Sequence, residues 1–183
     1  MNIILAVTGA SGSIYAERLL KYLSKNNKIL AVFSKNAIKI YQEETGSVLT
    51  ETDNIKIYDD GNFYAPFASG SFLSDAMVVC PCSMGTLGRI ASGVSDSLIT
   101  RAADVMLKER RKLILVVRET PYNLIHIRNM ETLTLAGAVI CPACPSFYSK
   151  PQTLEDMVDT VVFRVLDLLG IQNEGFRWGI TTS

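Results

Sequence analysis

The sequence predicts an α/β fold: a single Rossmann-like (flavodoxin-like) domain with a doubly wound parallel sheet. Five short apolar runs, rich in β-branched residues, alternate with longer segments in which apolar residues recur at helical spacing. These runs lack the apolar–polar alternation of a half-exposed strand, so we expect strands buried on both faces. The 183-residue chain shows no internal repeat or linker, which indicates one domain over residues 1–183, with a peripheral tail from about residue 172.

The first strand–helix unit, Ile3–Leu20, is the one around which the rest is organised. Its apolar run ends at Thr8, passes through the turn GASG, and becomes a helix in which Ile14 and Arg18 recur four residues apart. Ligands of doubly wound folds bind outside the carboxyl ends of the strands, often with a phosphate at a helix N-terminus. The GxxG spacing alone is a weak signal, and it does not indicate a dinucleotide.

The later elements follow the same alternation. We expect strands at Lys28–Phe33, Ala76–Cys80, Lys112–Val117 and Ala138–Cys141, with a short additional strand at Ile55–Tyr58. We expect helices at Asn36–Thr45 (capped by Ser34 and ended by Gly46), at Ser97–Arg110, from Pro121 to Gly137, and from Thr153 to Gly170. The core face of the last helix is predicted to be Leu154, Val158, Val161, Val165, Leu168 and Leu169.

The segment 47–75 is too long to be a simple connector, because long irregular loops in compact domains are usually functional. It carries four aromatic residues: Phe63, Tyr64, Phe67 and Phe72. We expect these rings to line a flat ligand or to face another subunit.

Composition narrows the function classes. The formal net charge is zero and no basic block is present, which disfavours nucleic acid and anionic membranes as partners. No apolar run approaches the length of a membrane span, and no cleavable leader is apparent. We therefore expect a cytoplasmic protein.

The four cysteines form two close pairs: Cys80 with Cys82, and Cys141 with Cys144. Both pairs follow apolar strands, so we interpret them as reduced thiols at strand ends; a zinc or redox site is the alternative. His126 is the single histidine, and no candidate base stands beside any serine, which disfavours a Ser-His-Asp hydrolase. One histidine also disfavours a histidine-based metal site.

Charged and hydroxylated residues gather where the predicted strands end. The hydroxyls are Ser11, Ser34, Ser83 and Thr86; the cations are Arg118, Arg101, Lys108 and Arg164; the carboxylates are Glu44 and Glu119. Several of them have an ordinary alternative as solvated surface charges, whereas Arg118 and Glu119 directly follow a buried strand and are the stronger indication. Such a set, with no metal ligands, suggests a phosphorylated cofactor and a phosphorylated substrate.

Several motifs resemble the flavin prenyltransferase family: TGASG, ASGSF, CSMGTL, TRAADVMLKERRKLILVVRETP, and PSFYSKP followed by RVLDLLGI. The resemblance covers nearly the whole chain in order. It implies an enzyme that transfers the dimethylallyl group of dimethylallyl phosphate to N5 and C6 of FMN without a metal. It also implies a trimer-based homo-oligomer, a dodecamer, that supplies prenylated FMN to a UbiD-type decarboxylase.

The resemblance also implies roles for particular residues. The FMN contacts would be Gly9, Ala10, Ser11, Ser34, Ser83, Met84, Gly85, Thr86 and Arg118. Dimethylallyl phosphate would contact Tyr148, Arg164, Lys108 and Arg101, with Lys108 and Arg118 completing the cluster across a subunit boundary. Proton handling would fall to Ser11, Glu44 and Glu119. One departure is Phe63, where many members carry a tryptophan.

Two other functions are compatible with a flavin-binding fold. The first is oxidative decarboxylation of a peptidyl cysteine or phosphopantothenoylcysteine, which depends on a histidine near the flavin; the helical position of His126 argues against it. The second is a non-catalytic FMN-binding subunit that supports a decarboxylase. It would have no need for Tyr148, Arg164 and Lys108 as a set.

Overall fold

The computed structural model of the protein describes residues 1–179 and shows a six-stranded parallel sheet with the strand order β3-β2-β1-β4-β5-β6. The strands are β1 Asn2–Val7, β2 Lys28–Phe33, β3 Ile55–Asp59, β4 Ala76–Cys82, β5 Lys112–Val117 and β6 Val139–Ile140. The helices are α1 Ser13–Leu23, α2 Lys35–Thr45, α3 Met84–Ala91, α4 Leu98–Lys108, α5 Leu124–Leu135 and α6 Leu154–Leu169, with a 3-10 turn at Pro66–Ala68. The predicted doubly wound fold is confirmed.

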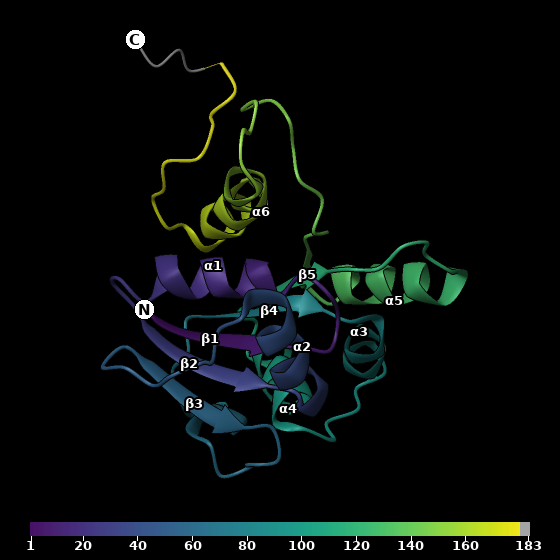
Figure 1. The fold of residues 1–183 in the computed structure, drawn as a ribbon. Helices are drawn as coiled ribbons and strands as arrows, with labels where there is room; N and C mark the ends of the chain where they lie inside the picture. The colour runs from purple at the N-terminus through teal and green to yellow at the C-terminus, as the bar shows by residue number, and fades with distance from the viewer. Residues whose placement is uncertain (180–183) are drawn as a thin grey trace.

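Helices cover both faces of the sheet, which is why its strands are apolar throughout. One hydrophobic core joins alternate strand residues such as Ile3 and Leu5 to α1, α2 and α6. The other joins Ile4 and Ala6 to α3, α4 and a buried residue of α5, Leu133. Figure 1 shows α1 and α6 above the sheet and α4 below it. A residue on α6 and a residue on α4 are therefore separated by the sheet.

The chain changes its direction of winding between β1 and β4, which are neighbours in the sheet. Loops that follow such strands diverge, and the crevice between them is where ligands of doubly wound folds bind. The buried Thr8 ties the two strand ends together, because its hydroxyl donates to the Pro81 carbonyl at 2.8 Å and accepts from the Ser83 N–H at 2.8 Å. The register of β4 shifts between Val79 and Cys82, next to this crevice.

A buried ion pair fixes α6 to α1. The Arg18 guanidinium donates to both carboxylate oxygens of Asp159, with Nε 2.8 Å from Oδ1, and the Tyr22 hydroxyl donates to Oδ2 at 2.8 Å. The hydrogen bond with Asp159 raises the pKa of Arg18 above its ordinary value. Because the Asp159 carboxylate is fully partnered, α6 has one defined position on α1.

Capping residues account for most of the helix ends. Two caps and one predicted core residue differ from expectation. α5 begins at Leu124 rather than Pro121, because Asn123 Oδ1 accepts the His126 N–H at 2.9 Å and makes Asn123 the cap. Ser34 is the N-cap of α2 as predicted, but its hydroxyl makes no capping bond. Leu154 was expected in the core but is 63% exposed, because it is the first residue of α6; Val162 and Leu166 complete the buried stripe instead.

The aromatic loop is only partly available to a ligand. Phe67 is buried in the second core, where its ring packs edge-on against Tyr58 with centroids 5.0 Å apart, so the expectation that it lines a ligand is wrong. Phe63 and Tyr64 are exposed. Arg111 anchors the end of the loop, because its Nη1 donates to the Phe72 carbonyl at 2.7 Å.

The cysteines are all free thiols. Cys80, Cys82 and Cys141 are buried and Cys144 is exposed; burial raises the pKa of Cys82 to about 12. Within residues 1–179, no group of three or more His, Cys, Asp or Glu side chains is placed to hold a metal ion. Over the same residues, none of the helices has the length and apolar character needed to cross a bilayer.

Candidate active site

The turn between β1 and α1, residues 8–13, is capped by a carboxylate from a different helix. Glu44 Oε2 accepts the N–H groups of Gly12 at 2.9 Å and Ser13 at 2.7 Å. Gly12 has a φ of 106°, a conformation that glycine adopts without strain. Glu44 stands at the unfavourable C-terminal end of α2, but it also stands at the N-terminus of α1, where the helix dipole favours an anion. The position of Glu44 is thus explained by α1, whose N-terminus it caps.

The same contacts keep Glu44 ionised. Partial burial raises its pKa, but hydrogen bonds from the Ser11 side chain and from the backbone of Ser13 and Gly12 outweigh this effect and leave the pKa below its ordinary value. The neighbouring Glu43 is exposed and pairs with Lys39 at 3.8 Å. Two adjacent glutamates therefore do different things: Glu44 organises the turn, and Glu43 is a surface charge.

Two hydroxyl groups near this turn make no hydrogen bond of ordinary geometry within residues 1–179. The Ser13 hydroxyl is one; it is buried and close enough to the Glu44 carboxylate to help lower the pKa of Glu44. Ser34 also lacks a capping bond, and its N–H donates to the Val7 carbonyl at 3.0 Å, which places it beside the β1 end. A Cβ on Gly9 would stand 3.1 Å from Asn36 Cβ, so glycine lets the turn approach α2. Ser13 is not among the residues predicted from the sequence; its position at a helix start after GASG was the available signal.

The turn between β4 and α3 is organised by Ser83. The Ser83 hydroxyl accepts the Thr86 N–H at 3.3 Å and donates to the Thr86 hydroxyl at 3.1 Å, which caps α3. Met84 and Thr86 are buried, whereas Gly85 is exposed with no atom within 4 Å of the position where its Cβ would stand. The exposed backbone at Gly85 is the part of this turn that a ligand can approach.

Arg118 and Glu119 extend the rim beyond β5. The Arg118 N–H donates to the Cys82 carbonyl at 3.1 Å, and Arg118 Cγ lies 4.0 Å from the position of a Gly12 Cβ. Arg118 therefore stands between the β1 and β4 strand ends, as the sequence predicts. Glu119 is exposed, and its Oε1 accepts the N–H of Thr120 at 3.0 Å.

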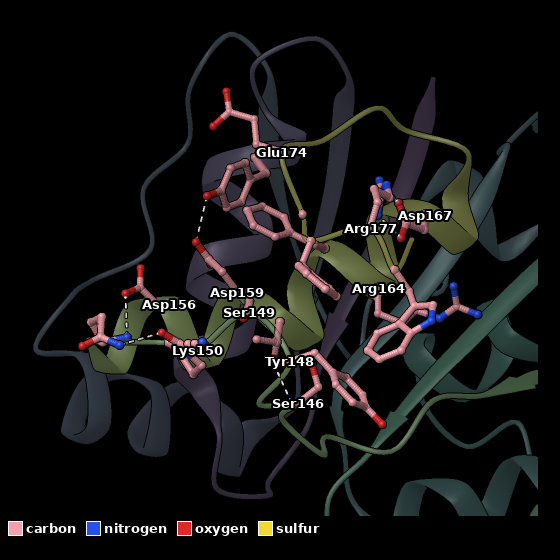
Figure 2. A pocket seen from close by; sticks show the side chains of 18 residues that line it. Ser146, Tyr148, Ser149, Lys150, Asp156, Asp159, Arg164, Asp167, Glu174 and Arg177 are labelled. Atoms are coloured by element: carbon pink, nitrogen blue, oxygen red, sulfur yellow. Dashed lines mark hydrogen bonds and ion pairs between the residues drawn. The ribbon is translucent and has the colours of Figure 1, made fainter. Parts of the chain in front are cut away.

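A cavity of about 1250 Å³ opens beside α6 (Figure 2). Tyr148 and Arg164 lie at one end of it and Lys150 and Asp156 at the other. Arg164 is exposed and forms no ion pair with any residue in 1–179, so its guanidinium can pair with a bound anion. Residues 174–178, part of the tail expected at the periphery, line this cavity; residues 180–183 of that tail lie outside the described residues.

Lys108 and Arg101 are not brought to this cavity within one chain. Both are on α4, across the sheet from α6. Lys108 pairs with Glu109, while Arg101 donates to Asp104 at 2.8 Å and to the Ala68 carbonyl at 3.0 Å. Their place in a phosphate site stays a prediction that requires a second copy of the chain.

Comparison with known proteins places this geometry in a family. The Flavoprotein family model matches residues 1–166. The flavin prenyltransferase UbiX of Methanocaldococcus jannaschii is 48% identical over 98% of this chain and 99% of its own length.

Solved structures are similar over nearly the same extent. AnUbiX (PadA1) in complex with FMN and dimethylallyl pyrophosphate is 43% identical, with a TM-score of 0.94 over 98% of each chain. A dodecameric FMN-dependent UbiX-like decarboxylase from Escherichia coli O157:H7 is 40% identical, with a TM-score of 0.92 over 97% of this chain and 99% of its own. A PPC decarboxylase, at 18% identity and a TM-score of 0.66, shares the fold alone. The chain therefore belongs to the Flavoprotein family and, within it, to the UbiX flavin prenyltransferases.

Proposed function

We propose that this protein transfers the dimethylallyl group of dimethylallyl phosphate to N5 and C6 of reduced FMN. The observation that carries the proposal is Arg164, which has no ion-pair partner in residues 1–179 and lines the α6 cavity together with Tyr148. The turns after β1 and β2 add hydroxyl groups without hydrogen-bond partners. A flavin nucleotide and an allylic phosphate both need anion recognition, and the two regions offer it separately. The proposal takes residues 1–183 as one flavoprotein domain.

FMN would bind at the turns after β1, β2 and β4. The proposed contacts are Gly9, Ala10, Ser11, Ser34, Ser83, Met84, Gly85, Thr86 and Arg118. The residues fit such a group because the buried Ser13 hydroxyl lacks a partner and the Ser34 hydroxyl is not used as a cap. Arg118 adds a positive charge beside these hydroxyls. Because Glu44 already binds the N–H groups at the start of α1, the hydroxyl and guanidinium donors are the groups that suit a phosphate here.

Reduced FMN, when bound, would supply the electron pairs for both new bonds. The bond to N5 replaces the allylic carbon–oxygen bond as phosphate leaves and N5 gives up its proton, and the bond to C6 forms as the allylic double bond takes up a proton and C6 loses its own. The chain must offset the charge on that leaving phosphate, and fixed cations are the means available in a site without a metal. Arg164 and the Tyr148 hydroxyl are the proposed phosphate contacts. Excluding water protects the allylic cation that develops as the bond breaks.

Ser11, Glu44 and Glu119 are the proposed proton-handling residues. A hydrogen bond from the Ser11 side chain is among the contacts that lower the pKa of Glu44, so the Glu44 carboxylate can orient the Ser11 hydroxyl in the β1–α1 turn. Glu119 is solvent-exposed at the rim, where it can exchange protons with water. Glu44 caps the β1–α1 turn, and Glu119 follows β5, the neighbour of β4 in the sheet.

We propose that the site is completed in a trimer-based dodecamer, since Lys108 and Arg101 reach it only from another copy. The dodecameric state of the Escherichia coli neighbour and an unusually apolar surface on α5 support this. The exposed apolar residues of α5 are Leu124, Ile125, Ile127 and Leu135. Large apolar side chains left exposed along one helix are favoured to be buried against another chain. The expected mass in light scattering is that of twelve chains.

The product would be supplied to a UbiD-type decarboxylase, and we place the reaction in the cytoplasm. Four free thiols support a reducing compartment. The downstream enzyme would take up prenylated FMN rather than unmodified FMN.

The deciding experiment incubates the purified protein anaerobically with reduced FMN and dimethylallyl phosphate, and measures the extracted flavin by mass spectrometry. We expect a flavin heavier by one five-carbon unit. Parallel reactions with the pyrophosphate establish which leaving group is used. Unmodified FMN in both reactions would contradict the proposal. A cysteine-peptide decarboxylation assay on the same preparation tests the alternative activity, and we expect no product.

A further inference from the structure

The C-terminal strap, residues 171–178, is held on α6 by a polar clasp built around one carboxylate. Arg177 Nη1 donates to Asp167 Oδ2 at 2.9 Å, and Nη2 donates to Oδ1 at 2.7 Å. Asn173 Nδ2 donates to the same Oδ1 at 2.8 Å. A guanidinium bound through two parallel hydrogen bonds has a fixed orientation as well as a fixed position. The end of the strap is thus tied to the last turn of α6.

Hydrogen bonds also fix the turn at residues 171–175 of the strap. Asn173 Oδ1 accepts the Gly175 N–H at 2.9 Å and Arg177 Nη2 at 3.3 Å, while Asn173 Nδ2 also donates to the Ile171 carbonyl at 3.1 Å. A Cβ on Gly175 would stand 2.8 Å from Phe163 Cβ, so only glycine lets the strap lie this close to α6. Asn173 therefore serves both the turn and the clasp.

The clasp decides where two exposed aromatic rings stand. The Trp178 ring packs edge-on against Tyr148 with centroids 5.0 Å apart, and Phe176 lies 6.4 Å from Trp178. Trp178 is 78% exposed and Phe176 51% exposed. Rings this exposed gain little from apolar burial, so packing alone cannot set their positions. The hydrogen bonds around Asp167 must do so.

We propose that Asp167, Asn173 and Arg177 are positioning residues that hold the strap as one wall of the site where the allylic phosphate binds. This rests on the function proposed above, since Tyr148 and Arg164 line the same cavity as the strap. The clasp is partly exposed, with Arg177 at 40% and Asp167 at 25% side-chain exposure. Exposed ion pairs add little to global stability, so a merely structural role predicts almost no effect of breaking the clasp.

The test uses Arg177→Gln, with Arg89→Gln as the matched control. Arg89 also forms an exposed ion pair, with Asp96 at 3.6 Å, but it lies on α3 across the sheet. Michaelis–Menten kinetics should show a roughly tenfold rise in KM for dimethylallyl phosphate in Arg177→Gln. FMN affinity and Tm should match the wild type, and Arg89→Gln should match it in every measurement. Arg177→Lys, which can donate to only part of the carboxylate, should fall between the two.

A second readout is independent of catalysis. Trp178 is the only tryptophan in the chain, so fluorescence excited selectively from tryptophan, at wavelengths that tyrosine does not absorb, reports the strap alone. Arg177→Gln should lower the fluorescence anisotropy of Trp178, and Arg89→Gln should not. Unchanged anisotropy and KM would overturn the proposal, as would a parallel loss of Tm and FMN affinity. If the wild type makes no prenylated flavin, the function fails, yet the anisotropy of the two variants still decides whether the clasp positions the strap.

Discussion

The β1–α1 turn and the α6 side of the cavity are built in opposite ways. In the turn, the N–H groups of Gly12 and Ser13 already have a partner in Glu44, and Thr8 ties the turn to the neighbouring strand end. On the α6 side, Tyr148 is 68% exposed and Arg164 forms no ion pair within residues 1–179. The backbone N–H groups of the turn are thus bound by the chain itself, whereas the Arg164 guanidinium has no carboxylate partner among the described residues.

This difference suggests how the two regions work. Groups that are hydrogen-bonded in the free protein keep their geometry without a ligand, so the turn can act as a fixed template for a flavin nucleotide. A free guanidinium stays solvated until an anion arrives, and its interaction strengthens as water is excluded. The α6 side should therefore contribute mainly when the second, phosphorylated ligand binds. Four changes test the comparison.

The largest effect is expected from Arg164→Ala. Removing one charge-stabilising donor from a transition state typically lowers kcat by about 100- to 1,000-fold. FMN affinity, measured by flavin fluorescence, should stay near the wild-type value, because the proposed flavin contacts lie at the strand ends and not on α6. Arg89→Ala serves as the control for loss of an exposed arginine. Near-normal turnover in Arg164→Ala would contradict the proposal that Arg164 on α6 stabilises the leaving phosphate.

The next effect concerns stability rather than turnover. Arg18→Met leaves the buried Asp159 carboxylate with Tyr22 alone, and breaking a buried pair in this way costs about 3 kcal/mol. Urea denaturation followed by circular dichroism measures the loss. Lys39→Met, which removes the partner of an exposed pair with Glu43, should change stability by about 0.5 kcal/mol at most. Equal losses in both variants would mean that α6 is not anchored through Asp159.

Strand bounds and helix caps could be predicted because each depends on residues that are close together in the sequence. The bounds of β2 and β5 match their apolar runs residue for residue. α6 starts after Thr153 as expected, and the predicted helix over Ser97–Arg110 is observed as α4 with Ser97 as its cap. The exception, Pro121, lies before a stronger cap at Asn123. Where the capping hydrogen bond of a helix is made by a nearby residue, the sequence alone is sufficient to place the end of that helix.

Long-range partners could not be predicted in the same way. Arg18 and Asp159 are 141 residues apart, and only a charged residue within the apolar stripe of α1 hinted at a buried partner. Glu44 reads as a misplaced charge until α1 is seen to begin beside it. Phe67 reads as a loop aromatic, yet it is part of the core. The candidate site could be located at the strand ends, but its wall on α6 and the strap depends on packing that the sequence does not display.

A smaller effect separates the two adjacent glutamates. Glu44→Gln weakens the cap of α1 and should cost about 1 kcal/mol at pH 7, in the range for N-cap losses. Because the pKa of Glu44 is lowered in the folded protein, its contribution is present above the unfolded pKa near 4.5 and is lost as pH falls through the lower folded value. Thermal melts from pH 3 to pH 7 should show the gap to wild type closing as pH falls. Glu43→Gln should show no such gap.

The smallest effect tests whether the α6 side is completed by another copy of the chain. Phe63 follows β3, at the opposite edge of the sheet from β6 and Tyr148, so it can approach the allylic group only from a second subunit. Tryptophan is a better cation–π partner than phenylalanine, and a difference of about 1 kcal/mol corresponds to a roughly fivefold change in rate.

Phe63→Trp should therefore raise kcat by about two- to fivefold. Tyr64→Trp is the matched control, because Tyr64 is adjacent and almost fully exposed. The gain should disappear when the protein is diluted until light scattering shows dissociation, since the ring then has no neighbouring site to face. A gain that persists in the separated chains, or an equal gain in Tyr64→Trp, would show that the loop acts without a partner subunit.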